Sequence, residues 1–155
     1  MSPPEDFDEA DALAALLAEW TPERLKQALD EVLELWQVID LRAAIRIRWN
    51  PRLRTTVGRA MLDELVLELN PRLLARHPEQ VRSVLVHEAA HLVVRRLHGP
   101  REAPHGKVWK GYMRRAGEDT RATHDLDVSG LRAAPRRRRP RKPRKPRWKP
   151  PWRLW

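Results

Sequence analysis

The hydrophobic residues at the start of the chain recur at helical spacing. Residues 7–19 are rich in Ala and Leu with interspersed acids, which predicts a helix. Thr21, Pro22 and Glu23 then have the features of a helix start: a capping hydroxyl, a proline in the first turn and an acid near the positive end of the helix dipole. This second predicted helix extends to about Val38. Its apolar stripe consists of Leu25, Leu29, Val32, Leu33 and Trp36.

From residue 44 the period changes from helical to alternating. Residues 45–49 alternate between large apolar side chains and arginine, which predicts a half-buried strand. Two more strands are predicted over Leu53–Ala60, with Gly58 at a bulge, and over Leu65–Leu69.

Helical spacing returns after the third predicted strand. An Asn-Pro pair predicts the cap of a short helix over residues 71–76. A longer, mostly buried helix is predicted over residues 78–98 and ends at a Gly-Pro pair. A further helix follows residues 105–106 and stops at Gly117, and residues 118–134 are predicted to be irregular, with a short strand near Leu126–Val128.

Charge is unevenly distributed along the 155 residues. Residues 135–155 hold 11 of the 31 Lys and Arg and none of the 21 acids, so the net charge of +10 belongs to the tail. We expect an acidic, helical N-terminal extension over 1–20, a single domain over 21–134 and a basic tail over 135–155.

The chain has no cysteine, no run of about eighteen apolar residues and an acidic start. The lack of cysteine excludes disulfides, a thiol nucleophile and a cysteine-ligated zinc ribbon. The other two features predict no transmembrane segment and no signal peptide. We expect a cytoplasmic protein, associated with the nucleoid if bacterial.

The most specific pattern is V-H-E-A-A-H-L over Val86–Leu92. His87 and His91 are four residues apart, so on a helix a single divalent metal can accept a nitrogen from each. Zinc lowers the pKa of a bound water to about 7, and Glu88 lies close enough to take its proton as the water attacks a carbonyl. This H-E-x-x-H arrangement is that of zinc metallopeptidases, and it predicts two metal ligands and a catalytic base.

A catalytic zinc usually takes a third protein ligand and leaves one position for water. His77 and His98 lie too far along the helix axis to share the ion. His105 follows a Pro/Gly loop that lets the chain return to the metal, so it is the preferred ligand, with His124 as its main rival. Three carboxylates are weaker alternatives as ligands: Asp119, Asp125 and Asp127. Asp125 or Asp127 could instead orient a ligand histidine.

Four elements in order resemble the SprT-like domain family. They are R-L-R-T-T-V-G-R-A, L-E-L-N-P-R-L-L, V-L-V-H-E-A-A-H-L and H-G-K-V-W-K, and with the N-terminal helix the resemblance covers roughly residues 20–117. The family places its third zinc histidine in an H-G-x-x-[WF] element about 14 residues after the second. Here His105 is 14 residues after His91, and Trp109 has the aromatic position.

The resemblance implies a small zincin-like α+β fold with a short mixed β-sheet packed on the HExxH helix. It implies that His87, His91 and His105 bind Zn²⁺ and that Glu88 is the general base. Family members of the Spartan kind are DNA-dependent proteases that degrade proteins crosslinked to DNA. Many members carry a C-terminal zinc ribbon, which this chain lacks, so its tail is expected to replace the ribbon as the nucleic-acid contact.

The tail has a proline at about every third position, which favours an extended, disordered chain. Its charges predict binding to nucleic acid, and its tryptophans suit stacking on bases of single-stranded DNA. The alternatives are an anionic membrane surface, an autoinhibitory clasp on acidic residues 5–11, and a tail that only solubilises. The predicted nucleic-acid contacts are Arg136, Arg137, Arg138, Arg139, Arg141, Lys142, Arg144, Lys145, Arg147, Trp148, Lys149, Trp152, Arg153 and Trp155.

Two functions fit these patterns. The first is a zinc endopeptidase that cuts a protein substrate while its tail holds it near nucleic acid. The second is a nucleic-acid-binding module with a structural zinc site. Glu88 favours the enzyme, because a structural site does not need it and is normally closed by four ligands.

Two smaller questions stay open at this stage. Tyr112 is either an oxyanion-stabilising residue or part of the core. The arginines of the strand region form either a solvated strand face or a basic lip that guides nucleic acid past the active site. They are Arg46, Arg48, Arg52, Arg54 and Arg59.

Overall fold

The computed structural model describes residues 8–121. Within this range the chain forms helices and a three-stranded sheet, so its class is α+β, as the sequence predicts. The elements are α1 (Glu9–Glu19), α2 (Pro22–Leu35), a 3-10 helix (Ile39–Ala43), β1 (Arg46–Trp49), β2 (Gly58–Met61), β3 (Val66–Leu69), α3 (Pro71–Ala75), a 3-10 turn (Pro78–Gln80), α4 (Val81–His98) and α5 (Lys107–Arg115).

Some sequence predictions lie outside the described residues. They are the strand near Leu126–Val128, the rival ligand His124, the acids Asp125 and Asp127, and the whole tail, residues 135–155. Among the helices that the structure describes, none is both long and apolar enough to cross a membrane.

The sheet is mixed and has the strand order β1-β3-β2. β1 runs parallel to β3, and β2 runs antiparallel to it. In this register Arg48 and Arg59 both lie opposite Glu68, one on each side. Because successive side chains of a strand point to opposite faces, Leu67 and Leu69 share the other face.

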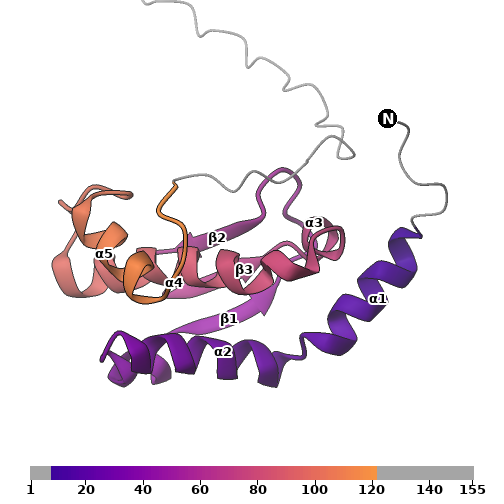
Figure 1. The fold of residues 1–155 in the computed structure, drawn as a ribbon, viewed down its shortest axis with the longest axis horizontal. Coiled ribbons are helices and arrows are strands. Elements are labelled where there is room, and N and C mark those ends of the chain that lie inside the picture. The colour runs from indigo at the N-terminus through magenta and orange to yellow at the C-terminus, as the bar shows by residue number, and fades with distance from the viewer. Residues whose placement is uncertain (1–7, 122–155) are drawn as a thin grey trace, which may run out of the picture.

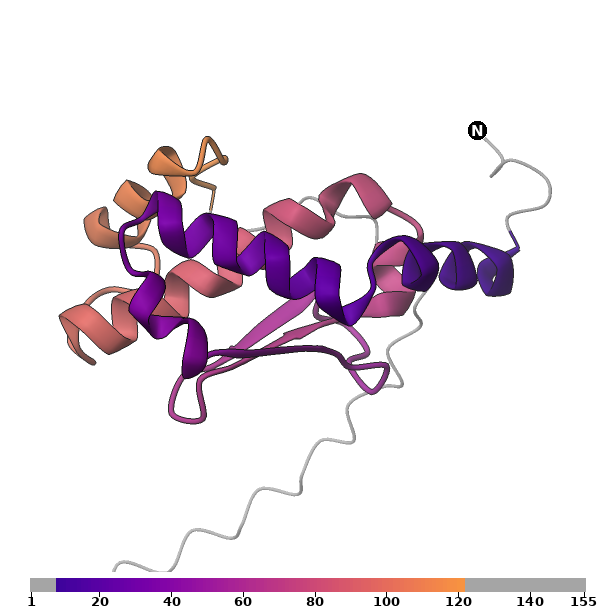
Figure 2. The ribbon, with the colours of Figure 1, turned by 90° about the horizontal axis from the view of Figure 1, so that it is seen from below.

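Helices cover only one face of this sheet. α2 and α4 lie side by side on that face, and the sheet forms a separate layer beneath them (Figure 1, Figure 2). Leu67 and Leu69 are fully buried and belong to the core together with Val84 and Leu85 of α4. Within residues 8–121 no helix covers the opposite face, as Figure 2 shows.

The predicted helix starts are confirmed by their caps. The Thr21 hydroxyl accepts a hydrogen bond from the Arg24 N–H, and Pro22 opens α2. The Asn70 side chain caps α3 in the same way. α2 ends at Leu35 rather than near Val38, because Gln37 has a φ of 60° and turns the chain out of the helix.

The second predicted strand is shorter than expected, since β2 covers Gly58–Met61 and not Leu53–Ala60. The reason is the fully buried Asn70, whose Nδ2 donates to the carbonyls of Leu53 (2.9 Å) and Thr56 (3.1 Å). A side chain therefore satisfies these carbonyls in place of a neighbouring strand, and the segment forms a loop.

α4 contains the H-E-x-x-H residues, and most of its length is buried. The helix is preceded by the 3-10 turn at Pro78 and ends before Gly99, which has a φ of 88°. The chain then loops back to α5, which contacts α4. This return brings the loop before α5 over the histidines of α4.

Candidate metal centre

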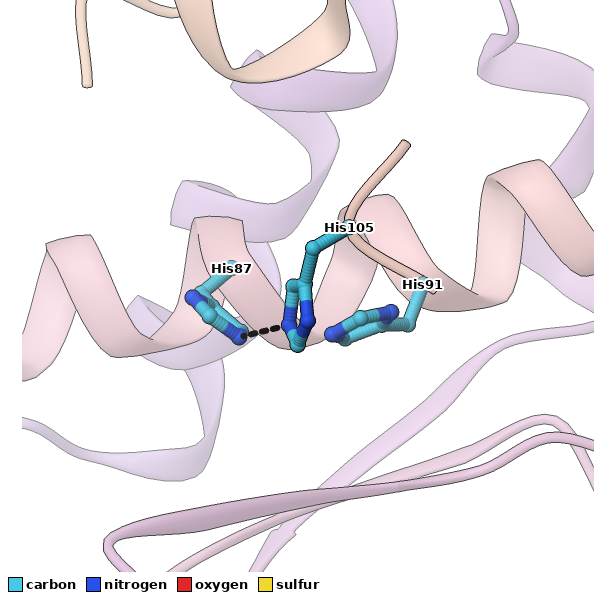
Figure 3. Close-up of side chains that lie close together, drawn as sticks. All are labelled: His87, His91 and His105. Atoms are coloured by element: carbon cyan, nitrogen blue, oxygen red, sulfur yellow. Dashed lines mark hydrogen bonds between the residues drawn. The ribbon is translucent and has the colours of Figure 1, made fainter. Parts of the chain in front are cut away.

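Three histidines from two segments meet above α4. His87 and His91 project from the helix, and His105 reaches them from the loop before α5 (Figure 3). Their candidate ligand atoms all lie within 4.8 Å of one another, and His105 Nε2 is 3.4 Å from His87 Nε2. Tetrahedral zinc with bonds of about 2.0–2.1 Å to nitrogen holds its ligand atoms about 3.3 Å apart, which the separation of His105 and His87 matches, and three imidazole nitrogens are a donor set that suits such a metal.

Trp109 of α5 packs against all three imidazoles. Its ring centroid lies 4.8 Å from those of His87 and His105 and 5.6 Å from that of His91, to which it is stacked. The indole is fully buried, and its N–H donates to the His87 carbonyl at 3.4 Å. This contact explains why an aromatic residue stands four positions after His105.

The site is closed on one side and accessible on the other. His87 is only 5% exposed, whereas His91 and His105 are half-buried. Among the described residues, no fourth His, Cys, Asp or Glu belongs to the cluster. Three protein donors with one accessible side leave room for a further ligand on a bound metal, whereas a structural zinc site is normally closed by four protein ligands.

The environment keeps two of the imidazoles neutral. Burial, with a smaller effect of His105, lowers the pKa of His91 to about 4. Burial, with the nearby Lys110, also lowers the pKa of His105. A neutral imidazole has a free lone pair to offer to a metal at neutral pH.

Glu88 lies between α4 and the edge of the sheet. Burial raises the pKa of its carboxyl to about 7, although a hydrogen bond from the backbone N–H of Ala60 acts in the opposite direction. A pKa near the working pH suits a group that first accepts and then returns a proton. The Ala60 contact holds the carboxylate against β2.

Within residues 8–121 no strand pairs with the outer edge of β2, and this free edge runs alongside Glu88. The Asn70 N–H donates to the Val57 carbonyl, so in the alternating antiparallel ladder Arg59 and Met61 pair with β3. Gly58 and Ala60 therefore direct their backbone groups away from β3, toward the free edge. The Ala60 N–H that reaches Glu88 belongs to this set.

A small pocket of about 110 Å³ adjoins the histidine cluster at His91. It lies where the β2–β3 turn, the end of α4 and the following loop meet. Its apolar lining residues are Leu62, Val94, Pro100 and Pro104, with Arg95 and Glu102 also lining it.

The other candidate residues lie elsewhere. His77 is 3.8 Å from Glu79, and Asp119 pairs with Arg121. His98 Nε2 lies 3.1 Å from the Tyr112 hydroxyl. Tyr112 is 9% exposed and packs edge-on against Trp36, so the structure gives it a core position and its hydroxyl a partner outside the cluster.

Two residues have structural roles that the sequence does not reveal, Gly58 beside Glu88 and Glu68 on the other face of the sheet. Gly58 was interpreted as a bulge, but its role is close packing, because a Cβ at this position would lie 2.9 Å from Glu88 Cγ. The sequence pattern assigns no role to Glu68. Its only signal in the sequence is an acid inside the apolar run L-V-L-E-L.

The family of the chain follows from comparison with known proteins. The SprT-like family profile matches residues 23–129, well over half the chain, and the chain belongs to this family.

Among curated proteins, Protein SprT of Escherichia coli (strain K12) and Protein SprT of Shigella boydii serotype 18 are both similar to it. Each is 40% identical over 80 residues, which is 50% of this chain and 48% of the relative. The chain thus matches about half the length of these relatives. No solved structure gives a significant match.

Proposed function

We propose that this chain is a zinc-dependent endopeptidase that acts on nucleic-acid-associated proteins, including proteins crosslinked to DNA. The observation that carries the proposal is the three-histidine cluster on the helix that also carries Glu88, whose buried carboxylate packs against the edge strand β2. Membership of the SprT-like family supports a metallopeptidase of this type.

The chemistry divides between a metal and the protein. His87, His91 and His105 would hold zinc, which when bound acts as a Lewis acid on a carbonyl and lowers the pKa of water. Glu88 takes the proton of the attacking water and then gives it to the leaving amine. The Ala60 N–H keeps the carboxylate oriented, and Trp109 keeps the imidazoles in place.

The substrate would bind as an extended peptide along β2. The outward N–H and carbonyl of Gly58 and the carbonyl of Ala60 can pair with it as an added strand, while the Ala60 N–H remains bound to Glu88. The pocket beside His91 has room for one small or medium apolar side chain. One small pocket gives a loose sequence preference, which suits an enzyme whose substrates are chosen by location.

The location would come from the tail, residues 135–155, which carries 11 positive charges and three tryptophans. Such a segment binds phosphates with salt-sensitive affinity and stacks on exposed bases, so DNA with single-stranded character is its proposed partner. The tether raises the effective concentration of the site near DNA-bound proteins.

The test is cleavage of a DNA-bound basic protein by the wild type and by Glu88→Gln, each with and without single-stranded DNA. We expect the wild type to cleave and DNA to stimulate it. We expect the variant to be inactive while retaining zinc and a native circular dichroism spectrum, because glutamine preserves the shape of the side chain.

Absence of cleavage by zinc-loaded wild type, with or without DNA, would favour the alternative, a nucleic-acid-binding module with a structural zinc site. The same experiment on a chain lacking residues 135–155 separates this alternative from an enzyme held inactive by its own tail. Recovery of activity in the truncated chain would indicate autoinhibition.

A further inference from the structure

The face of the sheet that no described helix covers is organised around a buried carboxylate. Glu68, in the central strand, is 1% exposed. Its Oε1 accepts hydrogen bonds from Arg48 Nε (3.0 Å) and Nη2 (2.6 Å). Its Oε2 accepts from Arg59 Nε (3.1 Å) and Nη2 (2.5 Å) and from Asn50 Nδ2 (2.9 Å).

This network holds two guanidinium groups at fixed positions without removing them from solvent. The side chains of Arg48 and Arg59 remain 62% and 50% exposed. Both use the same edge, Nε and Nη2, toward Glu68, so Nη1 of each has no partner within residues 8–121. One carboxylate charge is shared by two arginines, which leaves the group with a net positive charge.

Three more arginines extend the positive charge. Arg46 precedes Arg48 by two residues on β1 and so shares its face, while Arg52 and Arg54 lie in the loop that joins β1 to β2. All three are exposed and have no ion-pair partner in the part of the chain that the structure describes. We call these five residues the arginine face: Arg46, Arg48, Arg52, Arg54 and Arg59.

We infer that the arginine face binds the phosphates of single-stranded nucleic acid, as a second contact besides the tail. A planar guanidinium matches the geometry of a phosphate and also stacks on bases. Because Glu68 already fixes Arg48 and Arg59, less side-chain freedom is lost on binding. The choice of DNA as the polyanion rests on the proposed function, whereas the binding itself does not depend on proteolysis.

The arginine face lies close to the proposed peptide-binding edge, so nucleic acid bound there would have a role in delivering substrate. Arg59 lies between Gly58 and Ala60 in β2. These two neighbours contact Glu88, whereas the Arg59 side chain points to the opposite face of the sheet. Nucleic acid on the arginine face would therefore lie one strand away from the proposed peptide-binding edge. A protein attached to that nucleic acid would be brought to β2.

The test measures how the affinity of the full chain for a fluorescent oligothymidine depends on salt. The variant is Arg46→Gln/Arg52→Gln/Arg54→Gln, which leaves the Glu68 network intact. The matched control, Lys26→Gln/Arg96→Gln/Arg114→Gln, removes the same charge from exposed positions on α2, α4 and α5. Thermal unfolding checks that both remain folded.

Each lost phosphate contact on a single strand lowers the slope of log affinity against log salt by about 0.7. We expect the arginine-face variant to lose about 2 from this slope and to bind about tenfold more weakly at low salt. We expect the control to keep the wild-type slope.

Equal slopes for the wild type and both variants would overturn the inference and leave the tail as the only contact. An equal loss in both variants would also overturn it, because net charge alone would then explain binding. A defect seen only with phosphatidylserine vesicles would assign the face to a membrane surface instead. A chain that shows the slope change but no cleavage would sink the proposed protease and leave this inference standing.

Discussion

At Gly58 the sheet, α4 and the proposed catalytic base are in close contact. A Cβ built on Gly58 would lie 2.7 Å from Val84 Cγ1 and 2.9 Å from Glu88 Cγ. Real side chains do not tolerate such contacts, so only glycine lets β2 approach α4 this closely. The approach is also what allows the Ala60 N–H to reach Glu88.

Replacing Gly58 with alanine should therefore harm both stability and activity. We expect Gly58→Ala to lower the free energy of unfolding by about 1–3 kcal/mol, the usual cost of overpacking. We expect cleavage to fall more than zinc affinity, because Glu88 is displaced and the histidines are not. Urea unfolding and cleavage assays measure the two effects.

The chain offers a matched control for this substitution. Gly111 lies in α5, and a Cβ there meets no atom within 4 Å. Gly111→Ala should stabilise the protein by about 0.5–1 kcal/mol through helix propensity. Equal effects of the two substitutions would contradict the role assigned to Gly58.

Glu68 makes the stability of the fold depend on pH. Burial raises its pKa, but hydrogen bonds from Asn50, Arg48 and Arg59 outweigh burial and lower the pKa from 4.5 to about 2. A carboxyl whose pKa is lower in the folded state stabilises the fold above pH 4.5, and this contribution is lost as the pH falls toward 2.

The full difference corresponds to about 3 kcal/mol, but the two arginines are half exposed, so solvent screening reduces it. Between pH 6 and pH 3 we expect the wild type to lose about 1 kcal/mol more unfolding free energy than Glu68→Gln. Urea unfolding at the two pH values measures this. Parallel losses in the two proteins would show that the network contributes no pH dependence.

At the scale of elements, α5 supports the metal centre that α4 and the preceding loop form. Trp109 contacts all three histidines and donates a hydrogen bond to the His87 carbonyl. Groups that orient metal ligands typically account for 10–100-fold in metal affinity. α5 is thus part of the site although it contributes no ligand.

Trp109→Phe keeps an aromatic ring but removes the N–H and reduces the contact area. We expect zinc affinity, measured by competition with a chromophoric chelator, to fall by about tenfold while the protein stays folded. His77→Ala is the control, because His77 lies outside the cluster, and it should bind zinc as the wild type does. Unchanged affinity in Trp109→Phe would mean that the ring only fills the core.

The elements that the sequence predicted well are those with local signals. The caps at Thr21 and Asn70 and the turn at Gly99 fix helix boundaries through neighbouring residues alone. The predicted strand over Leu53–Ala60 was too long, because Asn70, which lies 14–17 residues away, determines where the loop ends. The 3-10 helix at Ile39–Ala43 has no strong pattern and was not predicted.

The residues of the site also divide into those with local sequence signals and those whose roles depend on distant parts of the chain. The roles of His87, Glu88 and His91 can be predicted from their spacing, because a helix alone brings the two histidines onto one face. The approach of His105 depends on the path of a loop and was supported by a family resemblance. The roles of Gly58 and Glu68 depend on the register of β2 against β3, which no local pattern specifies.

At the scale of the whole molecule, the two proposed binding surfaces are separated by the three-stranded sheet. The helices, including α4 with its two histidines, lie on one side of the sheet (Figure 2). Strand alternation places Arg46, Arg48 and Arg59 of the arginine face on the other side. A bound nucleic acid and a bound peptide would therefore not compete for the same surface.

Removal of residues 135–155 tests how binding is divided between the tail and this layer. We expect the truncated chain to lose most of its retention on a DNA column at low salt, because 11 of the 31 Lys and Arg are gone. The weak retention that remains should disappear when the arginine face is also neutralised. Full retention without the tail would refute its role as the main tether.

The alternation of side chains along β2 also limits which sequence changes this chain can accommodate. Gly58 and Ala60 serve the peptide side, and the intervening Arg59 serves the nucleic-acid side. Inserting or deleting one residue inside β2 would exchange these assignments, placing a guanidinium against α4 and glycine outward. The two surfaces must therefore evolve by substitution, because any shift of register disrupts both of them together.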